Sequence, residues 1–279
     1  MRKEGSILDK NYITSRLQGR TGNMMFQIAH GFAKSLEYNR QFVVPYGESS
    51  SKHLEKTVFR KIDFNIFQTP PQDKSKHIFV PFHYENVIPD NDKPTAFIGW
   101  FQTEKYFIKY NEIIKDLFSP TLEFVNKALN DFTFLNDSVV GAINVRRGDY
   151  LTQPRRHPVV TIDYINEAYK QLPYCDKIIV LSDDIEWCKE NIKLPKLVFV
   201  ENYRDCDALW LLSLCDHFII SNSSFSWWGA YLSRTDNKVV ISPETWFGPD
   251  VTDDPKDIWC DGWIKIPTIW KDGFIELKN

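Results

Sequence analysis

Short apolar runs alternate with segments of helical spacing through the second half of this 279-residue chain. KIIVLS at 177–182, HFIIS at 217–221 and KVVIS at 238–242 are strand-like along their length, while 162–172 and 208–214 carry apolar residues every three or four positions. Strands that are apolar on both faces belong to parallel sheets, because the connecting helices cover both sides. The pattern therefore predicts an α/β unit built around a parallel sheet.

The first half repeats this pattern less clearly, and no element can be assigned between 46 and 95. Two such units, joined near 118–138, predict a two-domain α/β enzyme with a cleft between the domains. In the first half the pattern predicts strands at 12–17, 41–44 and 97–100, a helix capped by Asn23, and a helix at 104–117.

Composition excludes several classes of protein. The 34 basic residues nearly balance the 37 acidic ones, so the chain lacks the positive field of a nucleic-acid-binding protein. Its five cysteines form no C-x-x-C pair and are expected to be reduced thiols. The first dozen residues lack the apolar core of a signal peptide, and no apolar run is long enough to span a membrane. We expect a cytoplasmic protein with no membrane span, and attachment to the inner membrane face stays open.

Three polar segments follow strands of the second half, and ligands of open parallel sheets bind beyond the carboxyl ends of the strands. The first contains Arg146 and Arg147, whose planar, permanently charged guanidinium groups suit a diphosphate. The alternative is a surface ion pair between Arg147 and Asp149.

The second segment, 221–229, leads from a strand into a helix, where backbone N–H groups and serine hydroxyls can bind an anion. The serines could equally cap that helix. The third segment places Asp183 and Asp184 after KIIVLS, where a carboxylate could accept a hydrogen bond from a base or a ribose, or could cap the following helix.

Metal and dinucleotide sites have little support. The turn at 19–23 lacks G-x-G-x-x-G and the P-loop lysine. Two D-x-D triplets, 90–92 and 205–207, match the metal-binding triplet of one large class of glycosyltransferases, but the first lies in a Pro-flanked loop with no strand leading into it and the second begins a helix. We expect no metal site and no cofactor.

Several motifs of the chain resemble those of one known family, the α-1,2-fucosyltransferases of glycosyltransferase family 11. GRTGNMMFQ is similar to the family's G-x-x-G-N-x-M-F-Q, GWFQTEKYF to G-Y-x-Q-S-E-K-Y-F, and RRGDY to H-x-R-R-G-D-Y. SDDIEWCKEN and SNSSFSWWG match two further signatures. The resemblance runs from about residue 12 to about residue 248, with the motifs in the family's order.

The resemblance implies a GT-B-like fold, with two Rossmann-like domains, parallel sheets and a cleft between them. It divides the chain into a flexible leader at 1–11, an acceptor-side domain at 12–135 and a GDP-fucose-binding domain with a C-terminal extension at 136–279. It also implies GDP-β-L-fucose as donor, a terminal β-galactoside in a glycan as acceptor, inversion to an α-linkage at the 2-hydroxyl, and no metal.

Carried over residue by residue, the resemblance assigns Arg146 to the diphosphate, with Arg147 close by. It places Asp183 or Asp184 near the nucleoside. The remaining residues expected to bind the donor are Asn222, Ser223, Ser224 and Phe225 at the phosphates, and Gly22 and Asn23 at the transferred sugar.

One position departs from the family, because Asn144 stands where a histidine is usual. Asparagine can exchange hydrogen bonds with the donor but holds no proton at neutral pH. Asp149 is the candidate base for the acceptor hydroxyl. Trp100 and Phe101 are either stacking platforms for a sugar or core residues.

Three other functions stay open at this stage. These are a fucosyltransferase of another linkage, a transferase of another guanine sugar nucleotide, and a non-catalytic relative that binds a glycan or nucleotide sugar.

Overall fold

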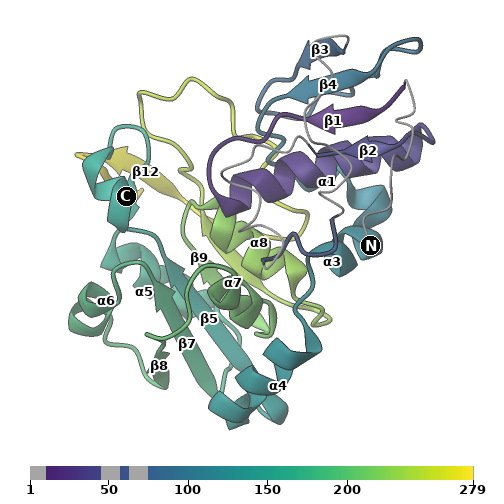
Figure 1. The fold of residues 1–279 in the computed structure, drawn as a ribbon. Coiled ribbons are helices and arrows are strands. Elements are labelled where there is room, and N and C mark those ends of the chain that lie inside the picture. Colours follow the sequence, from purple (N-terminus) through teal and green to yellow (C-terminus); the bar gives the residue numbers. More distant parts are fainter. Residues whose placement is uncertain (1–10, 45–56, 63–74, 279) are drawn as a thin grey trace. The chain divides into compact units, whose positions relative to one another are not determined.

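The computed structural model describes residues 11–44, 57–62 and 75–278. The chain divides into two compact units, one of residues 1–119 with 253–259 and the other of residues 120–252 with 260–279 (Figure 1). Each unit is built on its own parallel sheet, as the alternating pattern predicts. The leader expected at 1–11 lies almost wholly outside the described residues.

The N-terminal unit contains a four-stranded parallel sheet of order β2-β1-β4-β3. Its strands are β1 (Ile13–Ser15), β2 (Phe42–Val43), β3 (Lys76–Phe79) and β4 (Thr95–Ile98). Helix α1 (Thr21–Glu37) packs along β1 (Figure 1). A Cβ at Gly31 would lie 2.5 Å from the Phe42 ring and 2.7 Å from the Ser15 hydroxyl, so glycine allows this close approach.

Helix α1 begins two residues before the predicted cap. The N-cap is Arg20, whose backbone is extended, and Gly22 and Asn23 lie in the first turn. The helix predicted at 104–117 is instead two short 3₁₀ turns, η2 (Glu104–Tyr106) and η3 (Ile108–Tyr110), followed by α3 (Asn111–Phe118).

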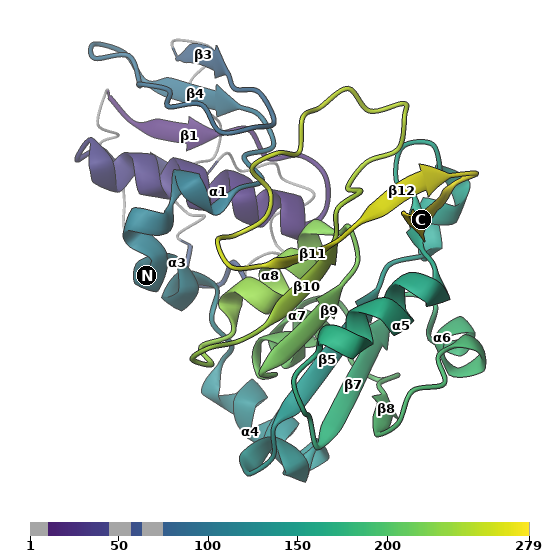
Figure 2. The same cartoon turned by 180° about the vertical axis from the view of Figure 1, so that it is seen from behind.

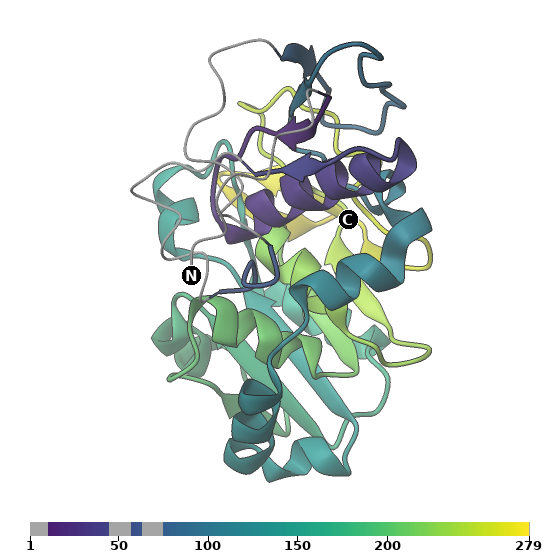
Figure 3. The ribbon, with the colours of Figure 1, turned by 45° about the vertical axis from the view of Figure 1, so that its right-hand side comes forward.

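The C-terminal unit contains a six-stranded sheet of order β11-β10-β9-β5-β7-β8, and every neighbouring pair is parallel. Helix α5 (Ile162–Gln171) lies on one face, and α7 (Asp205–Ser213) and α8 (Ser224–Leu232) pack together on the other (Figures 2 and 3). The strands are β5 (Val140–Val145), β7 (Lys177–Ser182), β8 (Leu197–Phe199), β9 (His217–Ile220), β10 (Val240–Pro243) and β11 (Ile264–Ile266).

A small sheet that the sequence analysis did not predict completes this unit. Strands β12 (Thr268–Lys271) and β13 (Phe274–Leu277) form an antiparallel hairpin, and β13 pairs in parallel with β6 (Val159–Val160). The hairpin turn is Asp272-Gly273, both with positive φ, as a two-residue type I′ turn requires.

The division between the units falls earlier than the predicted boundary at 135/136. Helix α4 (Leu122–Asp131) groups with the C-terminal unit, because its Phe124 packs against Trp210 and Tyr203, and Tyr203 also donates to the Asp131 carboxylate at 2.7 Å. Residues 253–259 group with the N-terminal unit, where Asp257 pairs with Lys105.

Candidate functional site

The three polar segments singled out in the second half meet at one edge of the six-stranded sheet. Strands β9, β5 and β7 are adjacent and parallel, so the residues that follow them emerge side by side. Arg146 follows β5, Asp183 follows β7, and Ser221 follows β9. This arrangement brings the predicted residues of the second half together at the carboxyl end of the sheet.

Arg146 is held by two carboxylates. One terminal nitrogen donates to Asp183 Oδ2 at 2.9 Å, and the other pairs with Asp149. The Arg146 side chain is 21% exposed. Because an arginine has five N–H donors, these contacts orient the guanidinium plane and leave further donors for an anion. Asp149 pairs with Arg146, whereas the alternative interpretation gave it Arg147 as its partner.

Arg147 is more buried than Arg146, with 11% of its side chain exposed. Its Nε donates to Asp184 at 3.0 Å, and its guanidinium lies 3.8 Å from the ring centroid of Trp187. Its backbone N–H donates to Asp183 at 2.9 Å. These contacts tie the end of β5 to the loop that follows β7.

Asp184 is also the N-cap of α6 (Ile185–Asn191), where its carboxylate accepts from the backbone N–H of Trp187. The capping interpretation therefore holds for Asp184, while Asp183 is engaged by Arg146 and by the Arg147 backbone. A nucleoside contact for either carboxylate stays a prediction.

Asn144 lies inside the sheet edge and is 8% exposed. Its Nδ2 donates to the backbone oxygen of Leu181 at 3.0 Å, and its Oδ1 accepts from the hydroxyl of Ser226. Both ends of the amide are thus used to connect β5 with β7 and with helix α8. The geometry makes Asn144 a positioning residue for the sheet edge.

The loop between β9 and α8 is ordered mainly by Asn222. This residue is 2% exposed, and its Nδ2 donates to the backbone oxygens of Pro158 and Trp246 at 3.1 and 2.9 Å. Ser223 is the N-cap of α8 by backbone geometry, without a side-chain capping bond, and Ser224 and Phe225 form the first turn. The first backbone N–H groups of α8 therefore stand at the same edge as Arg146.

Two neighbouring residues at this edge were not identified from the sequence. The Tyr150 hydroxyl donates to the backbone oxygen of Asn222 at 3.2 Å, and burial raises the pKa of Tyr150 to about 12. The His157 ring stacks on Tyr150 with a centroid distance of 4.9 Å and an interplanar angle of 22°. Tyr150 closes the RRGDY motif and could have been included, whereas His157 carries no spacing signal.

The predicted sugar-side residues belong to the N-terminal unit. Asn23, in the first turn of α1, accepts at Oδ1 from the Gln102 amide at 2.9 Å, and Gly22 beside it is buried. The contact of Gly22 and Asn23 with the transferred sugar stays a prediction.

Phe101 is a core residue rather than a sugar platform. It is fully buried and stacks on His30 with a centroid distance of 4.0 Å, while Trp100 is half-buried. The positive φ of Phe101, 54°, sets the direction of the chain just before Gln102.

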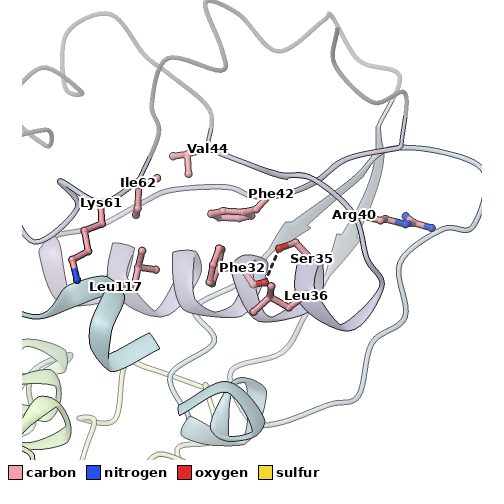
Figure 4. A pocket seen from close by; sticks show the side chains of 9 residues that line it. All are labelled: Phe32, Ser35, Leu36, Arg40, Phe42, Val44, Lys61, Ile62 and Leu117. Atoms are coloured by element: carbon pink, nitrogen blue, oxygen red, sulfur yellow. Dashed lines mark hydrogen bonds between the residues drawn. The ribbon is translucent and has the colours of Figure 1, made fainter. Parts of the chain in front are cut away.

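A cavity of about 360 Å³ in the N-terminal unit lies beside α1 and β2 (Figure 4). Phe32 and Leu36 of α1 and Phe42 of β2 contribute to its wall, with Lys61, Ile62 and Leu117 from later segments. None of the predicted site residues lines it.

The D-x-D triplets have local structural roles. Asp90 accepts the backbone N–H of Asp92 at 2.9 Å in a turn, and Asp205 begins α7. Within the described ranges, no three His, Cys, Asp or Glu side chains are grouped closely enough to hold a metal ion. No helix among the described residues is both long and apolar enough to cross a membrane.

Each unit has the parallel α/β sheet of a Rossmann-like fold, and in the C-terminal unit Arg146, Arg147 and the start of α8 at the carboxyl edge suit a phosphorylated ligand. The chain belongs to glycosyl transferase family 11, whose model matches residues 6–267.

Named relatives agree with that assignment. The chain is 31% identical over 273 residues to an α-1,2-colitosyltransferase of Escherichia coli, covering 84% of this chain and 92% of the relative. It is 33% identical over 239 residues to galactoside α-(1,2)-fucosyltransferase 1 of Saimiri boliviensis boliviensis, covering 78% of this chain and 64% of the relative.

The fold is shared with solved fucosyltransferases. The NodZ α-1,6-fucosyltransferase, in a crystal soaked with GDP-fucose, superimposes with a TM-score of 0.50 at 13% identity, covering 80% of this chain and 92% of NodZ. The GT-B-like fold expected from the motifs is confirmed.

Proposed function

We propose that this protein transfers L-fucose from GDP-β-L-fucose to the 2-hydroxyl of a galactoside, with inversion to an α-linkage. The observation that carries the proposal is the guanidinium group of Arg146, fixed by Asp149 and Asp183 at the edge where β5, β7 and β9 end. Membership of family 11 and the α-1,2 relatives support the linkage.

Transfer breaks the bond between C1 of fucose and the β-phosphate oxygen, and that oxygen gains negative charge as the bond stretches. A guanidinium held in place before the reaction stabilises this charge without reorganisation. The N–H groups at the start of α8 support the other phosphate oxygens. In this proposal Arg146 and the helix start take the place of a divalent cation, and no cofactor takes part.

The acceptor hydroxyl must lose its proton while its oxygen bonds to C1. Asp149 remains the candidate base. Its Oδ1 is paired with Arg146, so in this proposal the proton goes to the second carboxylate oxygen, Oδ2. A glycan acceptor, and no nucleic acid, is the partner we expect.

The test is incubation with GDP-fucose and a terminal β-galactoside, with the linkage of the product determined by NMR. We expect an α-1,2-fucosylated product, and Arg146→Ala should reduce turnover on the order of a hundredfold. Arg155→Ala is the matched control, because Arg155 is an exposed arginine paired with Asp250. Absence of any product, or equal loss in both variants, would contradict the proposal.

A second donor is favoured by one observation, the similarity to an α-1,2-colitosyltransferase over 92% of that relative's length. Direct competition between GDP-fucose and a GDP-linked colitose in the same assay shows which of the two sugars the protein transfers. The donor with the larger kcat/KM is the substrate.

A further inference from the structure

We propose that His157 is a further residue of the donor site, whose imidazole takes up a proton when a nucleotide diphosphate binds at Arg146 and so becomes another cation beside it. This inference rests on the proposed function, because it requires a diphosphate at Arg146.

The described edge of the sheet carries more carboxylates than guanidinium groups. The guanidinium groups of Arg146 and Arg147 are paired with the carboxylates of Asp149, Asp183 and Asp184. Two positive charges thus face three negative ones before any ligand is present. A diphosphate diester adds two more negative charges, so its binding favours any nearby group that can become positive.

His157 and Arg146 both lie beside the ring of Tyr150. The His157 ring stacks on Tyr150, and the Arg146 guanidinium carbon lies 5.6 Å from the centroid of the same Tyr150 ring. Arg146 and His157 are therefore both neighbours of one aromatic side chain. The positive charge of Arg146 already acts on the His157 imidazole and lowers its pKa, so an anion bound at Arg146 acts on that pKa in the opposite sense.

The segment around His157 is rigidly held. The carbonyl oxygens of Arg155 and Arg156 accept from the N–H groups of Asp250 and Gly248 at 3.0 Å each. The backbone oxygen of Pro158, the residue after His157, accepts from the Asn222 side-chain amide. The imidazole is thus presented from a fixed backbone, as a binding residue requires.

The charged groups around the imidazole set the direction of the effect. Burial lowers the pKa of His157, and Arg156 and Arg146 lower it further, while Asp149 acts in the opposite sense. The uncharged neighbours are Tyr150 and Phe247, the latter with its ring centroid 6.2 Å from that of His157. Without ligand the ring is neutral at pH 7, and a diphosphate that engages Arg146 shifts the balance toward the imidazolium.

Calorimetric titration of the full chain with GDP-fucose tests this directly. The diphosphate diester of this ligand has no group that titrates between pH 5 and 8, so proton uptake reports the protein. Repeating the titration in buffers of different ionisation enthalpy gives the number of protons bound. We expect net uptake at pH 7 and an affinity that rises as the pH falls from 8 to 6, by at most about tenfold per pH unit.

Two variants and a control separate the proposed role from a structural one. His157→Gln should lose the uptake and the pH dependence and match the wild type at pH 8. His157→Arg, whose planar cation can stack on Tyr150, should bind tightly at every pH without uptake. His77→Gln, which removes an exposed histidine of β3 in the other unit, should retain the wild-type uptake.

The outcomes are distinguishable. If GDP-fucose does not bind the wild type at all, the proposed function fails. If it binds with no proton uptake, or if His157→Gln keeps the uptake, only the inference about His157 is overturned. Should the variants fail to fold, the NMR titration of the His157 ring in the wild type decides, because saturation with GDP-fucose must raise the pKa of His157.

Discussion

The buried amide of Asn144 gives the sharpest test of how the sheet edge is built. Asn144→Ala removes the donor to the Leu181 oxygen and the acceptor for the Ser226 hydroxyl. Each buried hydrogen bond contributes about 0.5–1.5 kcal/mol, and the substitution removes two. Ser226 retains a partner, since the Ser221 hydroxyl lies 3.2 Å away. We therefore expect a loss of about 1–3 kcal/mol in the free energy of unfolding.

Two further variants make the test specific. Asn144→Asp can still accept from Ser226 but cannot donate to Leu181, and it buries a negative charge, so it should destabilise the protein more than alanine does. Asn136→Ala is the matched control, because the Asn136 amide donates to the Thr133 oxygen on the exposed surface. Its change should stay within about 0.5 kcal/mol.

The assay is urea unfolding followed by tryptophan fluorescence, since Trp227 and Trp228 are buried in α8 beside Ser226. If Asn144→Ala were as stable as Asn136→Ala, or if aspartate were tolerated better than alanine, the role of Asn144 in connecting β5, β7 and α8 would be refuted.

Three other variants test separate parts of the account. Arg147→Lys loses the stacking on Trp187 and should lower stability by about 1 kcal/mol in thermal unfolding, and an unchanged melting temperature would contradict that contact. Asp149→Asn should reduce turnover on the order of a hundredfold while GDP still binds at Arg146, which keeps its pair with Asp183, and unchanged turnover would remove Asp149 as the base. His30 is fully buried, and burial and then Lys34 hold its pKa well below 6.5. The unfolded chain therefore takes up a proton below pH 6.5 that the folded chain does not, so stability is complete above that pH and falls by up to about 1.4 kcal/mol per unit below it. His30→Phe should reduce the fall of the unfolding free energy with pH between pH 6.5 and 5. An identical pH dependence in the wild type and the variant would refute this role of His30.

The fold was predictable where burial alone decides the pattern. KIIVLS forms β7 at the predicted residues, because a strand covered on both faces must be apolar throughout. The small sheet was missed although Asp272-Gly273 is a recognised hairpin signal, since its flanking strands are partly exposed and short. The helix predicted at 104–117 is interrupted at Phe107, whose φ of −139° ends the first 3₁₀ turn.

The candidate site was predictable in its location but not in its internal contacts. Parallel strands bring Arg146 and Asp183 to one edge wherever the strands are adjacent, and sequence spacing reveals that much. Which arginine pairs with Asp183 and which with Asp184 depends on how the segments after β5 and β7 meet, which the sequence does not state. The sequence also does not reveal that the amides of Asn144 and Asn222 donate to backbone carbonyls of distant segments, and a contact of either residue with the donor stays a prediction.

The central claim is that a fixed guanidinium group, rather than a divalent cation, binds the diphosphate. The most direct measurement is the affinity for GDP in the presence of EDTA, compared between the wild type and Arg146→Gln by calorimetry. The account predicts that chelation leaves the wild-type affinity unchanged and that the variant binds at least about tenfold more weakly. Loss of wild-type binding on chelation, or equal affinity in the variant, would contradict it.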